Sequence, residues 1–134
     1  VGSWPRTGLW VEVADVTTNV TGPSLKEIFY EVDRLRTEAP PEAELNGIKN
    51  NMVGIFTIQN SSRGGVINQL QFVDQYGLGD HYLSSYVKNV LAVTPEQIQQ
   101  TALKYLDPSR MTITVVGDKK TVEAQLEPYR AGVP

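Results

Sequence analysis

The stretch that decides the fold is AVTPEQIQQTALKYLDPSRMTITVVGD, residues 92–118. Its first part predicts a helix, because Thr94 is placed to cap it, Pro95 suits its first position and Gln97 completes a capping box. Asp107-Pro108 then ends the helix, since the residue before a proline avoids helical geometry. The face expected to point inward carries Ile98, Ala102 and Tyr105.

Two segments predict β-strands. After the helix, Met111, Ile113 and Val115 alternate with threonines up to Gly117-Asp118, which is the two-residue period of a strand. Residues 9–16, LWVEVADV, also alternate, and both of their faces are partly apolar. That pattern suits a strand covered on one face and partly on the other.

The remaining sequence predicts helices. The first helix follows the break at residues 21–23, where Ser24 and Glu27 form a capping box. Residues 39–41 separate it from the second helix. Gly77 ends the third helix, and Asp80 caps the fourth. A last helix is expected from Asp118 to Pro128, followed by a frayed tail. Residues that recur at helical spacing, and are therefore predicted to be buried, are Leu25, Ile28, Phe29, Val32 and Leu35; Leu45, Ile48, Met52, Ile55 and Phe56; Val66, Ile67, Leu70, Val73 and Tyr76; Leu83, Tyr86, Val87, Val90 and Leu91; and Val122, Ala124 and Leu126.

Two glycines fall inside the second of these helices. Gly47 and Gly54 each cost about 1 kcal/mol relative to alanine in a helix. Close packing against a neighbouring helix is the expected reason for them.

The amino-acid composition excludes several classes of function. The chain has 134 residues, a net charge of −3, one histidine and no cysteine. The charge and the absence of basic clusters argue against nucleic-acid binding, and no apolar run approaches the ~20 residues that span a bilayer. Without cysteine, disulfides, thiol catalysis and thiolate metal sites are excluded.

Much of the chain, roughly residues 8–129, resembles one family. Five segments are similar in amino-acid sequence, order and spacing to a domain of the pitrilysin/insulinase-type zinc peptidases. They are GLWVEVADVTT, SLKEIFYEVDRLRTE, PPEAELNGIKNNMVGIF, INQLQFVDQYGLGDHYLSSYVKNVLAVT and the stretch quoted first. The resemblance implies an α+β fold in which helices pack on one face of a mostly antiparallel sheet. With only two strands recognised, we expect the N-terminal strands to be missing from a single domain at residues 1–134. The alternative is a self-sufficient helical protein with a minor sheet.

The resemblance does not bring an active site. Peptidases of this family bind zinc through His-x-x-Glu-His, and His81 is the only histidine here. The chain is therefore similar to the second, inactive half of the family's duplicated architecture. It is expected to hold no catalytic, cofactor-binding or metal residue, with zinc in the partner half. Arg6, Gly8 and Trp10 superficially resemble the family's Arg…Tyr substrate-binding segment, but the spacing differs and that role is not carried over to them.

The function implied by the resemblance is that of a non-catalytic domain. It would pair with a zinc-bearing half, in the same or a separate polypeptide, to form the substrate chamber of a metalloendopeptidase that cleaves peptides. Bacterial family members suggest a periplasmic or cell-envelope location. The alternative is a non-proteolytic scaffold or interaction module on the same fold, as family members in respiratory complexes are. A second copy of the chain, bound through an exposed sheet edge, is a further expected partner.

Other polar residues have structural explanations. His81 is expected to be solvent-exposed, Glu42 and Glu44 to complement a helix dipole, and Gly64-Gly65 to begin a helix without making a nucleotide site. The solvated charges of the first helix are Glu31, Asp33, Arg34, Arg36 and Glu38. Asn19-Val20-Thr21 and Asn60-Ser61-Ser62 fit the N-glycosylation pattern, which two triplets can do by chance, and an aromatic surface patch is predicted from Trp4, Trp10, Tyr82 and Tyr86.

Overall fold

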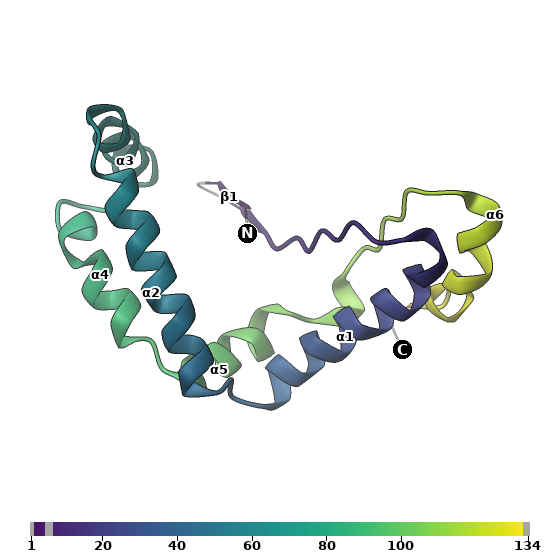
Figure 1. Cartoon of the computed structure of the whole chain (residues 1–134). Helices are drawn as coiled ribbons and strands as arrows, with labels where there is room; N and C mark the ends of the chain where they lie inside the picture. The colour runs from purple at the N-terminus through teal and green to yellow at the C-terminus, as the bar shows by residue number, and fades with distance from the viewer. Residues whose placement is uncertain (1, 5–6, 133–134) are drawn as a thin grey trace. The chain divides into compact units, whose positions relative to one another are not determined.

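The computed structural model describes residues 2–4 and 7–132, and side chains over residues 8–132. The described chain is mainly helical (Figure 1). In order, its elements are β1 (Gly2–Trp4), β2 (Thr7–Leu9), η1 (Thr18–Val20), α1 (Thr21–Thr37), α2 (Glu42–Gln59), α3 (Arg63–Tyr76), α4 (Tyr82–Ala92), α5 (Pro95–Tyr105), η2 (Pro108–Arg110), α6 (Lys119–Val122) and η3 (Glu123–Tyr129).

The expected α+β sandwich, with helices on one face of a mostly antiparallel sheet, is wrong. Within the described residues the only sheet is the antiparallel pair β1–β2, with three residues in each strand and Ser3 opposite Gly8. Residues 10–17 and 111–116 are not assigned to strands, although both carry the alternating pattern. Alternation suits a strand but supplies no partner for its backbone hydrogen bonds, so it did not produce a sheet here.

The chain divides into two compact units. Unit 1 comprises Val1–Glu12 and Pro41–Pro95, and unit 2 comprises Val13–Pro40 and Glu96–Pro134. The prediction of one domain over residues 1–134 stays a prediction.

In unit 1, α2 and α4 lie side by side, and α3 lies at one end of this pair (Figure 1). Leu45 of α2 is buried. Along the α2–α4 interface, the ring of Phe56 stacks on that of Tyr86 with centroids 4.2 Å apart. At its other end the Lys49 amino group donates a hydrogen bond of 3.2 Å to the carbonyl oxygen of Leu91, in the last turn of α4. A cation suits this position because carbonyl groups at a helix C-terminus carry partial negative charge.

In unit 2, the buried apolar side chains are Val32 of α1, Ala102 of α5 and Val122 of α6. Gln99 ties α5 to the end of α1 through a hydrogen bond of 2.7 Å from its side-chain nitrogen to the carbonyl oxygen of Thr37. The predicted inward stripe of α1 is confirmed, because its five residues are buried or half-buried. The predicted α5 face is confirmed at Ile98 and Ala102 and wrong at Tyr105, which is exposed.

Local signals placed several helix ends correctly and missed others. The residue that precedes α4 is His81 rather than Asp80, and Pro128 lies inside η3 rather than ending a helix. α5 begins at Pro95, Gly77 follows α3 in the left-handed conformation at φ 61°, and the Asp118 carboxylate accepts from the Thr121 backbone N–H at the start of α6. α1 differs, since it begins at Thr21 rather than after Pro23. The first turn tolerates proline because an N–H there has no acceptor within the helix.

In unit 1 the burial prediction is confirmed for part of the predicted residues and wrong for the others. The predicted residues that are buried or half-buried are Leu45, Phe56, Val73, Tyr76, Leu83, Tyr86, Val87 and Val90. On α2, Ile48, Met52 and Ile55 were expected in the core, yet all three are exposed. On α3, Val66, Ile67 and Leu70 are exposed as well, and so is Leu91 of α4. These helices therefore turn much of their apolar surface outward.

Close packing does not explain the two glycines of α2. A Cβ atom built on Gly47 or on Gly54 meets nothing within 4 Å beyond its chain neighbours and the backbone of its own helix. The expected packing reason is therefore wrong for both positions within the described part of the chain.

Candidate functional site

His81 lies at the surface, at the position that precedes the first turn of α4. Its role in the structure comes from its backbone, since its carbonyl oxygen accepts hydrogen bonds from the hydroxyls of Ser85 at 2.7 Å and Ser84 at 3.1 Å. Over residues 8–132, no three side chains of the metal-binding types gather in one place.

The charged residues of α1 form local pairs on its surface. Arg34 contacts Glu31 at 3.1 Å, and Arg36 contacts Asp33 at 3.3 Å. The exposed pair Arg34–Glu31 contributes little, about 0.2–0.5 kcal/mol. Arg36 was expected to be solvated, but its side chain is half-buried. Glu42 and Glu44 lie exposed in the first turn of α2, where the helix dipole favours them.

Gly64-Gly65 starts α3 in a tightly packed turn. The Ser62 hydroxyl accepts a hydrogen bond of 3.1 Å from the Gly65 N–H, which satisfies one donor that an anion would otherwise use. A Cβ on Gly65 would lie 1.6 Å from the carbonyl oxygen of Gln59. Glycine at this position is therefore required by the turn itself.

Asn60 and Thr21, from the two glycosylation-like triplets, have structural partners. The Asn60 side-chain nitrogen donates to the carbonyl oxygen of Phe56 at 2.7 Å. The buried Thr21 hydroxyl donates to the carbonyl oxygen of Thr18 at 2.9 Å. Both triplets thus contribute to helix ends.

Aromatic residues of unit 1 form one cluster, but with a different membership from the predicted patch. Tyr82 lies edge-on to Tyr86 at 6.2 Å, Tyr86 stacks on Phe56, and Phe72 of α3 lies 6.1 Å from Tyr82. Phe72 also contacts Tyr76 at 4.6 Å. The rings thus link three helices, while the side chain of Trp4 and the whole of Arg6 lie outside the described residues.

Two carboxyl groups have a lowered pKa, and both cap short helices. The Ser109 hydroxyl and N–H lower the pKa of Asp107, and the Thr121 hydroxyl lowers that of Asp118. Each hydrogen bond favours the charged form. Such groups remain ionised at neutral pH, which suits a helix cap and does not suit a general acid.

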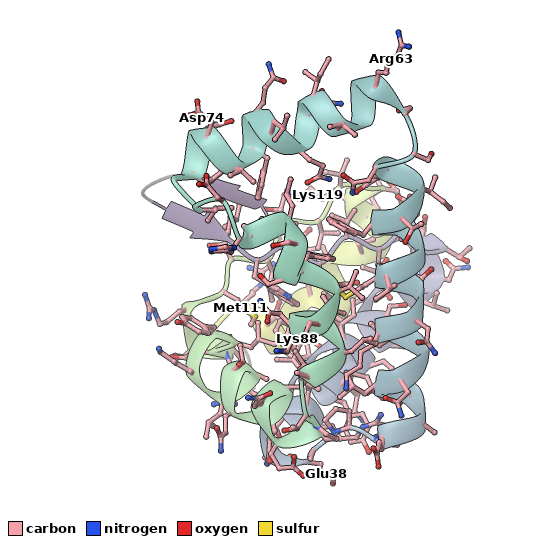
Figure 2. All side chains as sticks on the ribbon, turned by 90° about the vertical axis from the view of Figure 1, so that its left-hand side faces the viewer. Glu38, Arg63, Asp74, Lys88, Met111 and Lys119 are labelled. Carbon is pink, nitrogen blue, oxygen red and sulfur yellow. The ribbon has the colours of Figure 1, made fainter. Side chains whose placement is uncertain are left out.

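The clearest functional feature is a pair of exposed apolar helix faces. We define the α2 stripe as Ile48, Met52, Ile55 and Ile58, and the α3 stripe as Val66, Ile67 and Leu70; all seven are exposed, Ile58 by 73%. Figure 2 shows α3 between the labelled Arg63 and Asp74, with side chains projecting on both sides of the helix. Between Leu45 and Val73 the only charged residues are Lys49, which is buried, and Arg63.

This composition is typical of an interaction surface. Exposed helix faces normally carry many charged residues, and large uncharged apolar areas mark contacts with other molecules or domains. The sequence contained the signal, because residues 45–73 have almost no charge. The periodic apolar residues in this range were interpreted as the core of this chain rather than as exposed surface.

Comparisons with family models, curated proteins and solved structures found no match to this chain. The peptidase resemblance accordingly rests on the quoted residues alone. None of the helices in the described residues combines the length and apolarity needed to cross a membrane.

Proposed function

We propose that this chain is a non-catalytic partner domain of a pitrilysin/insulinase-type zinc metalloendopeptidase. It pairs with a zinc-bearing half and forms part of the wall of a chamber in which peptides are cleaved. The zinc-bearing half supplies the metal and the general base. This chain supplies the association surface and hydrolyses no peptide alone.

The observation that carries the proposal is the exposure of the α2 and α3 stripes. Burying apolar surface stabilises an association by about 25 cal/mol per Å², so seven exposed aliphatic side chains favour a lasting contact with a folded partner. The scarcity of charge on this part of the chain has the same consequence, since charged residues are depleted at the cores of interfaces. The order of the peptidase-like segments is what assigns the partner.

The same surface also favours a second candidate, a scaffold subunit with no protease partner. Exposed apolar stripes indicate that a partner binds, but they do not identify the partner. The two candidates differ in whether peptide hydrolysis appears when a half-domain with His-x-x-Glu-His is present.

The test mixes the purified chain with a separately expressed His-x-x-Glu-His half-domain of a pitrilysin-type peptidase and follows cleavage of a quenched, unstructured peptide. We expect no cleavage by either protein alone and cleavage by the mixture. Binding of the two proteins without cleavage would favour the scaffold function, and absence of binding would overturn the peptidase assignment.

A matched pair of variants tests the surface. Ile55→Asp places a charge in the α2 stripe and should weaken binding by about 2 kcal/mol, roughly thirtyfold. Asn51→Asp adds the same charge to an exposed polar position of the same helix and should leave binding nearly unchanged. Equal effects of the two variants would show that the stripe is not the contact.

A further inference from the structure

We draw no further inference here: the strongest candidate, the exposed face of α2 that carries Gly47 and Gly54 beside Ile55 and Ile58, belongs to the association surface already described, and nothing in the structure shows what covers it.

Discussion

The side-chain oxygen of Gln125 accepts a hydrogen bond of 2.9 Å from the backbone N–H of Gly22. Its side-chain nitrogen donates to the carbonyl oxygens of Thr18 and Thr121, at 3.0 Å each. One amide thus satisfies a free N–H in the first turn of α1 and joins it to η3, although the two residues are 103 positions apart. The position of Gln125 in the sequence gives no sign of this role.

Replacing Gln125 by alanine should destabilise unit 2. The change leaves the part-buried N–H of Gly22 without this partner and removes one of the donors to the Thr18 carbonyl oxygen, at a cost of about 1–3 kcal/mol. Urea denaturation followed by circular dichroism measures the loss. Gln100→Ala, at an exposed site on α5, should stay within about 0.5 kcal/mol of the unmodified chain, and an equal loss there would contradict the role given to Gln125.

The two adjacent glycines at the start of α3 should respond oppositely to alanine. Gly65→Ala places a methyl group against the carbonyl oxygen of Gln59 and should cost about 1–3 kcal/mol. Gly64→Ala meets no atom within 4 Å and should be neutral or stabilising, by up to about 1 kcal/mol. Thermal unfolding of the two variants side by side measures the difference, and similar midpoints would disprove the tight turn.

Lys49 should matter for the pairing of α2 with α4. Lys49→Met keeps most of the buried aliphatic chain and removes the hydrogen bond to Leu91, so we expect a loss of about 1–3 kcal/mol. Lys88→Met, at an exposed position on α4, is the control and should have little effect. Hydrogen exchange at the last turn of α4 should increase in the first variant only.

Acid should remove a contribution made by Asp118. The Thr121 hydroxyl lowers the pKa of Asp118 below its ordinary value of 3.8, so the stabilisation is present above that value and is lost as the pH falls through the lowered pKa. Thr121→Val removes this hydroxyl and brings the pKa of Asp118 back toward 3.8. The variant should be less stable than the unmodified chain at neutral pH, and the difference should vanish in acid. Urea midpoints of the two proteins across the pH range measure this difference. A stability difference that is constant with pH would argue against a contribution from the ionised Asp118.

Helix ends were predictable because their signals are local. Pro95, Gly77 and Asp118 each act through geometry or a hydrogen bond within a few residues, and each marks the expected boundary. The start of α1 was missed because Pro23 was taken as a break, while the first turn of a helix accepts proline.

Burial and sheet formation were not predictable in the same way. Periodicity identifies Ile48, Met52 and Ile55 as one face of α2, but it does not say whether this chain or another molecule covers that face. Likewise, the alternation at residues 111–116 correctly indicates which side chains point inward, yet a sheet also needs a second strand. The proposed association surface, the α2 and α3 stripes, is the place where the first of these expectations failed.

The division of the chain has a consequence for the order of folding. Residues 41–95 of unit 1 are inserted between the two segments of unit 2, so unit 2 must close a long loop before Gln125 reaches Gly22. Contacts of such large sequence separation form slowly. The α2–α4 pair lies within the insertion, and its Lys49–Leu91 hydrogen bond holds the two ends of the insertion near each other. Early formation of that helical pair would shorten the loop that unit 2 has to close. Folding of unit 1 would therefore speed the joining of the two segments of unit 2.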